Sequence, residues 1–197
     1  GVRYVLAKST PNTAEIGGQT LRLMKRFGIR NSAVVFDAGG GGKQIADYLR
    51  DRGYTEVSDV QFGGKARARD EYANRRAELY GELRKALEPT PAVRRLLTLD
   101  AHTWRKTDTS CLALPPADGE LRQDLAVLPL SRDGEGRLRL PPKDIGRKTS
   151  DRREASVREL LGGRSPDRGD ALALAYLGWR DLCDELELQT IKRPLVW

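Results

Sequence analysis

The chain has 197 residues, of which 39% are hydrophobic and 32% charged, and its formal net charge is +7. This length suffices for one domain with a core, and the composition excludes a disordered chain. Its two cysteines, Cys111 and Cys183, lack the spacing of metal ligands, which argues against a zinc site or a disulfide framework. No apolar run approaches the roughly 20 residues that cross a bilayer, so we expect no membrane partner. The positive charge favours a polyanionic partner without requiring one.

The first third of the sequence alternates between strand and helix patterns. The expected elements are a strand at residues 2–7, a helix at 13–27, a strand at 33–36, a helix at 43–52 and a strand at 57–62. Gly28 and Gly53 mark the ends of the two helices. Because strands that alternate with helices form parallel sheets with crossover connections, this order predicts an α/β fold.

The remaining sequence is richer in helix patterns. We expect helices at 70–88, 118–127 and 170–186, hairpin strands at 128–130 and 137–140, and a helical turn at 157–161 within an arginine-rich loop. Ser165 or Asp167 can cap the last helix, and Pro166 suits its first turn. This helix is expected to pack deeply because apolar residues cover much of its circumference: Ala171, Leu172, Leu174, Ala175, Leu177, Trp179 and Leu182.

An apolar strand that ends in a carboxylate is the most informative stretch. Asp37 follows Val-Val-Phe and precedes four glycines, Gly39 to Gly42, after which a helix begins. A strand of an open α/β sheet delivers its last residue to the carboxyl edge, where ligands bind. Asp37 is therefore either a cap for the glycine turn or a functional acid. A nucleotide-binding loop is disfavoured because Gln44 replaces the Mg²⁺-binding hydroxyl of that motif.

A second acidic pair begins the last helix. Asp167 and Asp170 lie three residues apart in its first turn. Interaction with the helix dipole is enough to explain an acid at Asp167. Asp170 adjoins residues expected in the core, and a carboxylate at the edge of a buried helix requires a cation as partner. Acids from a strand end and a helix start can converge on divalent metal, as two-metal phosphodiester cleavage requires. Nearby arginines would attract a phosphate backbone: Arg67, Arg69, Arg147, Arg152, Arg153, Arg164 and Arg168.

Five stretches occur in an order that resembles the C-terminal nuclease domain of the terminase large subunit of tailed bacteriophages. They are residues 34–49 (VVFDAGGGGKQIADYL), 60–66 (VQFGGKA), 72–80 (YANRRAELY), 136–143 (GRLRLPPK) and 165–174 (SPDRGDALAL). The resemblance implies an RNase H-like fold, in which helices flank a central mixed sheet. It also implies a Mg²⁺- or Mn²⁺-dependent endonuclease that cuts concatemeric double-stranded DNA during genome packaging.

The resemblance assigns roles to individual residues. The metal site of this family takes three acids, of which Asp37 matches the second and Asp170 the third, while Asp167 matches an auxiliary ligand. Asp37 and Asp170 are thus the expected catalytic acids of a two-metal site. Lys143 and Arg168 match basic positions near the site in this family. Together with Lys43, Lys65, Arg67 and Arg164 they are the expected DNA-binding residues. The implied partners are double-stranded DNA, a portal protein and a terminase small subunit, and the implied location is the host cytoplasm.

One departure from the family pattern limits the expected activity. The first acid of the family belongs to an opening strand, and residues 2–6 contain no carboxylate. We therefore expect residues 1–197 to form a single, N-terminally truncated nuclease domain that lacks the first strand and the ATPase domain and cleaves weakly or not at all. Two alternatives stay open: another RNase H-like nuclease of the resolvase or transposase type, and a non-catalytic basic DNA-binding module.

Overall fold

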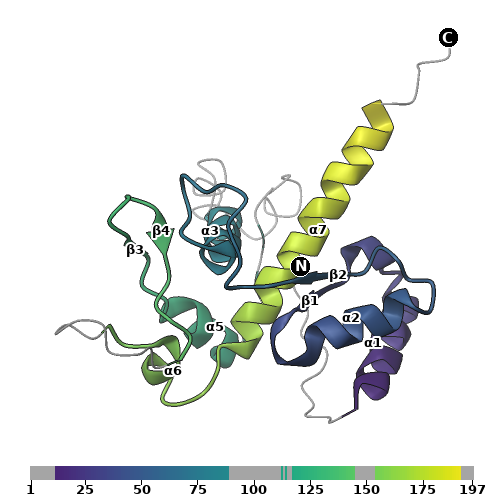
Figure 1. Cartoon of the computed structure of the whole chain (residues 1–197), viewed down its shortest axis with the longest axis horizontal. Helices are drawn as coiled ribbons and strands as arrows, with labels where there is room; N and C mark the ends of the chain where they lie inside the picture. The colour runs from purple at the N-terminus through teal and green to yellow at the C-terminus, as the bar shows by residue number, and fades with distance from the viewer. Residues whose placement is uncertain (1–11, 89–111, 113, 115–116, 145–153, 192–197) are drawn as a thin grey trace, which may run out of the picture.

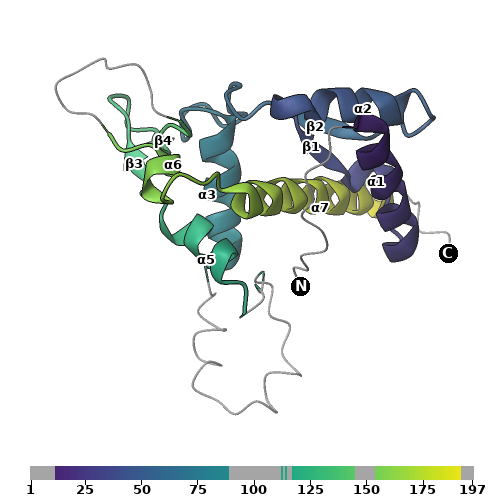
Figure 2. The ribbon, with the colours of Figure 1, turned by 90° about the horizontal axis from the view of Figure 1, so that it is seen from below.

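The computed structural model describes residues 12–88, 112, 114, 117–144 and 154–191, with residues 185–191 described by backbone alone. Its α-helices and β-strands, labelled in Figure 1, are α1 (Thr13–Phe27), β1 (Val35–Asp37), α2 (Gly42–Arg50), β2 (Ser58–Val60), α3 (Arg75–Leu87), α5 (Gly119–Ala126), β3 (Ser131–Arg132), β4 (Leu138–Arg139), α6 (Val157–Leu160) and α7 (Asp167–Ile191). Two short 3-10 helices, η1 (Asn31–Ala33) and η2 (Gly39–Gly41), flank β1. The long helix α7 spans the molecule: α3 and α5 pack near its beginning, and β1 packs further along it (Figure 2).

The strands β1 and β2 pair in parallel, with Val35 opposite Ser58 and Asp37 opposite Val60. Helix α2 connects them and buries Ile45 and Leu49 in a cluster against which α1 packs. The strand–helix–strand order read from the sequence is therefore confirmed, and the described part of the chain is a mixed α/β structure. The expected helix at 13–27 is also confirmed, with Asn12 as its N-cap.

The described residues do not contain the single central sheet that the resemblance implies. They form two separate sheets of two strands each, β1–β2 and β3–β4. The expected strand at 2–7 lies outside the described residues. Residues 92–110, for which the sequence predicts no clear element, also lie outside them. The coarse α/β class is thus established, while the central mixed sheet stays a prediction.

Side-chain caps shift several element boundaries from those expected. The helix expected from residue 70 begins only at Arg75, because the side chain of Asn74 accepts a hydrogen bond from the Ala77 amide and fixes the helix start there. In the hairpin, pairing moves from 128–130 to Ser131–Arg132. Asp133 explains this shift, since its carboxylate accepts the amides of Glu135 and Arg137 and closes a tight turn.

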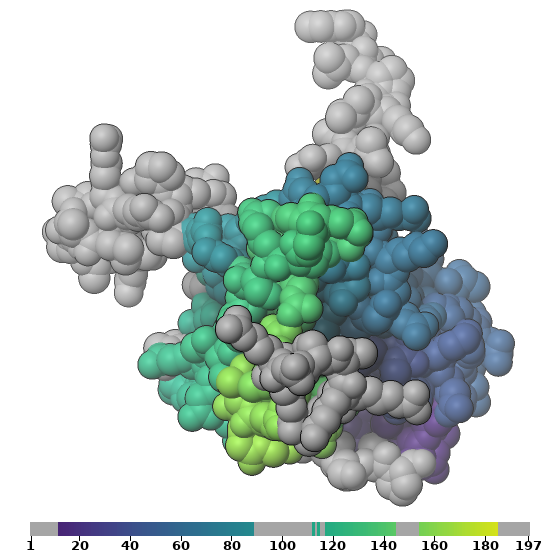
Figure 3. All heavy atoms as spheres, turned by 60° about the vertical axis from the view of Figure 1, so that its left-hand side comes forward, coloured from purple at the N-terminus to yellow at the C-terminus, as the bar shows by residue number. Residues whose placement is uncertain are grey.

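The hairpin is attached to the segment that precedes α3. The Leu138 amide donates to the Glu71 carbonyl at 2.7 Å, and the Leu138 carbonyl accepts from the Ala73 amide at 2.9 Å. In the space-filling view of Figure 3 the green hairpin accordingly stands beside the blue surface of this segment. These two hydrogen bonds hold the hairpin beside the start of α3, and residues 140–144 follow directly after the hairpin.

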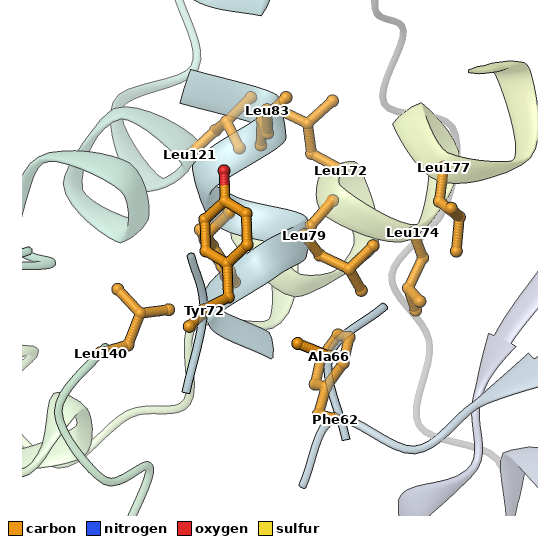
Figure 4. Packing of buried hydrophobic residues seen from close by; sticks show 13 residues of the cluster. Phe62, Ala66, Tyr72, Leu79, Leu83, Leu121, Leu140, Leu172, Leu174 and Leu177 are labelled. Atoms are coloured by element: carbon orange, nitrogen blue, oxygen red, sulfur yellow. The ribbon is translucent and has the colours of Figure 1, made fainter. Parts of the chain in front are cut away.

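The main core lies between α3 and α7 and is closed by α5 and the segment around the hairpin. Leu79 and Leu83 of α3 meet Leu172 and Leu177 of α7, with Leu121 of α5 beside them (Figure 4). Burial of these side chains supplies the hydrophobic stabilisation of this half of the molecule.

Helix α7 is buried less completely than its composition predicts. Ala171, Ala175 and Trp179 are exposed, and Trp179 retains 56% of its accessible surface. The reason is geometric: these residues are four positions apart and form one stripe, and the described elements pack against the other face of the helix. The prediction of deep packing is therefore correct for Leu172, Leu174 and Leu177 and wrong for the exposed stripe.

Gly42 begins α2 directly behind the end of β1, where no side chain fits. A Cβ atom there would lie 1.8 Å from the backbone oxygen of Asp37. We expect Gly42→Ala to lower the free energy of unfolding by about 3 kcal/mol, the upper end of overpacking costs, because backbone must move. Urea denaturation measures this change. Gly18→Ala is the matched control: Gly18 is inside α1 with no atom within 4 Å, so alanine should stabilise by about 0.5–1 kcal/mol. Equal effects of the two substitutions would contradict the close packing.

Candidate functional site

A groove of about 760 Å³ opens where β1 ends. Its walls come from the ends of β1 and β2, the starts of α3 and α7, the segment after β4, and α6. Its acidic and basic lining residues are Asp37, Asp144, Asp167, Arg76, Lys143 and Arg158. The groove thus collects charged side chains from segments that are far apart in the sequence.

Asp37 faces this groove and also caps the glycine turn. Its Oδ1 accepts a hydrogen bond from the Gly39 amide at 2.9 Å. Gly40 and Gly41 have φ values of 56° and 94°, which favour glycine and allow the chain to turn tightly away from the acid. The Oδ2 atom receives no hydrogen bond from the described residues. Asp37 therefore has a structural role at one oxygen, and its other oxygen is available to accept a hydrogen bond or to ligate a metal.

Asp170 is 5% exposed and is bound on both oxygens. Its Oδ1 accepts hydrogen bonds from the Tyr80 hydroxyl at 2.7 Å and from the Arg76 guanidinium at 3.4 Å. Its Oδ2 accepts from Nζ of Lys143 at 2.9 Å. The cation that a buried Asp170 requires is therefore supplied by the protein itself, and Lys143 connects this carboxylate to the groove.

Sequence reasoning assigned no functional role to Arg76 or Tyr80. Both lie on the face of α3 that carries Leu79 and Leu83, and the Arg76 guanidinium lies 5.4 Å from the Tyr80 ring centroid. Arg76 also makes a long hydrogen bond of 3.5 Å to the Pro141 carbonyl. An arginine at the leucine spacing of a buried helix face is the signal that would have identified them, because such a charge needs a buried acid.

The start of α7 is held by a residue that the sequence did not indicate. Asp124 of α5 is fully buried, and its Oδ2 accepts from the amides of Arg168 and Gly169 at 3.1 and 3.0 Å. Its Oδ1 forms an ion pair with Arg164 at 2.5 Å. The expected caps, Ser165 and Asp167, are not the acceptors of these two amides. Asp124 therefore positions the helix turn that carries the acids of α7.

The six expected DNA-binding residues occupy three different environments. Lys143 lies in the groove, and Lys65 and Arg67 lie on an exposed loop that continues from the groove wall at Gly63. Lys43 is exposed and pairs with Asp47 at 3.2 Å.

Arg164 and Arg168 are directed toward α5 and do not line the groove. Arg164 pairs with Asp124, and Arg168 pairs with Asp118 at 2.6 Å and Glu120 at 2.8 Å. The arginines Arg147, Arg152 and Arg153 lie outside the described residues.

The groove offers carboxylate oxygens of the kind that a divalent metal binds. Asp37 and Asp167 line the same groove, and carboxylates of this kind suit Mg²⁺ or Mn²⁺. Within residues 12–88, 117–144 and 154–184, no group of three or more His, Cys, Asp or Glu side chains is arranged to hold a metal ion. Carboxylate chemistry at Asp37 and Asp167 therefore suits such a cation, whereas both oxygens of Asp170 are already engaged by Tyr80, Arg76 and Lys143.

Comparison of the chain with models of protein families, with curated proteins and with solved structures gave no match. The resemblance to terminase nucleases therefore depends on the five sequence stretches. In the described part of the chain, no helix combines the length and the apolar character needed to cross a membrane.

Loss of the Asp124 carboxylate should destabilise the start of α7. We expect Asp124→Ala to lower the free energy of unfolding by about 3 kcal/mol, because it leaves two amides and the Arg164 charge without their buried partner. Asp144→Ala removes an ion pair with Arg158 whose acid is 67% exposed, and should cost under about 1 kcal/mol. Chemical denaturation measures both variants. A cost at Asp124 no larger than at Asp144 would refute the capping role.

Tyr80 should make stability depend on pH in the alkaline range. Burial and the adjacent charge of Asp170 raise the pKa of Tyr80 well above its ordinary value, with Arg76 opposing. A raised phenol pKa stabilises the fold below about pH 10 and loses this effect at higher pH, because the unfolded chain ionises first. We expect Tyr80→Phe to cost about 1.5–3 kcal/mol at pH 7 and to flatten the decline above pH 10.

Denaturation curves at pH 7 to 11 test this expectation. Tyr54→Phe serves as the control because Tyr54 packs against the other core cluster and does not contact Asp170. An unchanged alkaline decline in Tyr80→Phe would show that other groups cause it.

Proposed function

We propose that the chain is a metal-dependent DNA endonuclease domain of the RNase H-like type, from the large subunit of a phage packaging terminase. The observation that carries this proposal is that Asp37, which ends a strand, and Asp167, which begins the last helix, line one groove together with Lys143 and Arg76. Metal-dependent phosphodiester hydrolysis requires carboxylates that bind metal and cations that bind phosphate. Side chains of both kinds line this groove.

Each residue of the groove has a distinct part in this proposal. Asp37 and Asp167 would hold a divalent cation, which when bound supplies an activated water and neutralises phosphate charge. Lys143 pairs with Asp170 at 2.9 Å while it also lines the groove, so its ammonium can exchange between this carboxylate and a phosphate oxygen. Tyr80 and Arg76 keep Asp170 oriented during that exchange.

The finer features of the proposal follow the family pattern. They are a central mixed sheet flanked by helices, a two-metal site completed by a third acid, cutting of concatemeric double-stranded DNA, and association with a portal protein and a terminase small subunit in the host cytoplasm. A resolvase- or transposase-type nuclease would share the groove chemistry and differ in the domain that accompanies it.

Direct Mn²⁺ binding tests the central claim without depending on turnover. We expect Asp37→Asn to weaken Mn²⁺ binding at least tenfold in calorimetric titration of the chain, because a metal-ligating carboxylate is lost. Asp47→Asn is the control, since Asp47 is an acid on α2 that pairs with Lys43 and Arg50 outside the groove. Equal Mn²⁺ affinity in Asp37→Asn and the parent would overturn the proposal.

A non-catalytic DNA-binding module is the second candidate, and one observation favours it. Both oxygens of Asp170 are engaged by Tyr80, Arg76 and Lys143, as in a purely structural ion-pair network. This candidate requires salt-sensitive duplex binding that is indifferent to Mn²⁺ and to Asp37→Asn. Duplex binding by the parent and by Asp37→Asn, measured with and without Mn²⁺, therefore decides between the two together with the Mn²⁺ titrations.

A further inference from the structure

A basic loop runs from the wall of the groove to the start of α3. It comprises residues 63–69 and carries Lys65, Arg67 and Arg69, all of which are exposed, whereas Ala66 between them is 4% exposed. The buried alanine anchors the loop to the core and leaves three cations at alternate positions on its surface. Arg67 has an ion pair of 3.7 Å with Asp181 of α7, but its side chain is 66% exposed, so it can be redirected at little cost.

The backbone of this loop is fixed by one buried carboxylate, Glu78. The side chain of Glu78 is 8% exposed and lies in the first turn of α3. Its Oε2 accepts the Arg67 amide at 2.9 Å, and its Oε1 accepts the Ala68 amide at 3.1 Å. The Arg75 guanidinium donates to Oε2 at 2.5 Å and neutralises the acid.

Two further hydrogen bonds attach the beginning of the loop to the same helix. The amide of Arg75 donates to the Gly64 carbonyl at 2.8 Å, and the amide of Arg76 donates to the Phe62 carbonyl at 2.9 Å. The first turn of α3 thus binds the loop at both ends. Because Phe62 and Gly63 line the groove, the same contacts set the position of the loop relative to the groove.

The position of Glu78 calls for an explanation beyond local stability. Surface loops satisfy their amides with water at little cost, whereas burying a carboxylate carries a desolvation penalty. Burial acts to raise the pKa of Glu78, but the amides of Arg67 and Ala68 and the charge of Arg75 outweigh it and lower the pKa, so the group is ionised at neutral pH.

We propose that Glu78 is a positioning residue for polyanion binding: it holds residues 63–69 in one backbone conformation at the edge of the groove, where Lys65, Arg67 and Arg69 bind the phosphates of a DNA strand that enters it. This inference rests on the proposed function, since it takes DNA as the ligand. A preformed row of cations binds phosphates without the entropic cost of ordering a loop.

The salt dependence of duplex binding tests the loop. Fluorescence anisotropy of a labelled 30-base-pair duplex is measured over a range of KCl concentrations in EDTA. The variant Lys65→Gln/Arg67→Gln/Arg69→Gln should reduce the slope of log affinity against log salt by about 2 to 3, since each lost phosphate contact removes about 0.9. The matched control Arg22→Gln/Lys25→Gln/Arg26→Gln removes the same charge from exposed positions of α1 and should reduce it by under about 1. Equal reductions would overturn the assignment of the loop.

The sign of the effect at Glu78 distinguishes positioning from simple electrostatics. Removal of an acid normally strengthens DNA binding, and Glu56→Gln, at an exposed position between α2 and β2, should do so slightly. Glu78→Gln should instead weaken binding about tenfold and accelerate hydrogen exchange of the Arg67 and Ala68 amides. Unchanged or tighter DNA binding by folded Glu78→Gln would overturn the proposal.

If Glu78→Gln fails to fold, Glu78→Asp replaces it, because it keeps the charge and shortens the reach by one methylene. Faster exchange at Arg67 and Ala68 together with weaker binding then supports the proposal, and parental binding overturns it. Because these measurements exclude metal, they are independent of the Mn²⁺ titration of Asp37. A chain that binds Mn²⁺ through Asp37 but ignores the loop charges keeps the proposed function and refutes this inference.

Discussion

The buried carboxylate of Asp170 is the constraint on which the arrangement of the groove depends. A charge at 5% exposure is tolerated only with partners, and its three partners come from α3 and from the segment after β4. Arg76 and Tyr80 join α3 to α7, and Lys143 joins the segment after β4 to α7. Removing any one partner leaves the others facing an incompletely compensated acid, so these segments are coupled by one electrostatic requirement as well as by the leucine core.

The same carboxylate relates stability to the proposed chemistry. In the described arrangement Asp170 is neutralised by the protein, whereas Asp37 and Asp167 present oxygens to the groove. A phosphate that entered the groove with a metal would compete with Asp170 for the ammonium group of Lys143. The ion pair between Lys143 and Asp170 stabilises the fold, whereas a phosphate bound in the groove would draw Lys143 away from Asp170. These two interactions compete for Lys143, which contacts Asp170 and also lines the groove.

Local patterns predicted much of the fold, and long-range contacts explain what they did not predict. The helix at 13–27 and the parallel strand pair follow from periodicity and glycine stops, and the structure contains both. Asp37 and the auxiliary acid Asp167 line one groove, whereas Asp170, the acid that the sequence paired with Asp37, does not line it and is bound by Tyr80, Arg76 and Lys143. The cap from Asp124 could not be predicted from local patterns, because it joins residues 44 positions apart. The exposure of Trp179 could not be predicted either, because composition alone does not tell which side of a helix the neighbouring elements cover.

The order of the chain has a consequence for how the groove is assembled. The bonds from Tyr80 and Arg76 to Asp170 connect residues 90 and 94 positions apart, and the cap from Asp124 closes a further long loop. During synthesis, α3 and α5 emerge well before α7, so the charged face of α3 exists for a time without its acid. Folding of this half must wait for the last helix, which raises the contact order and delays completion. The groove is thus the last part to form, and a ribosome-bound chain that ends before Asp170 lacks the carboxylate that Tyr80, Arg76 and Lys143 bind.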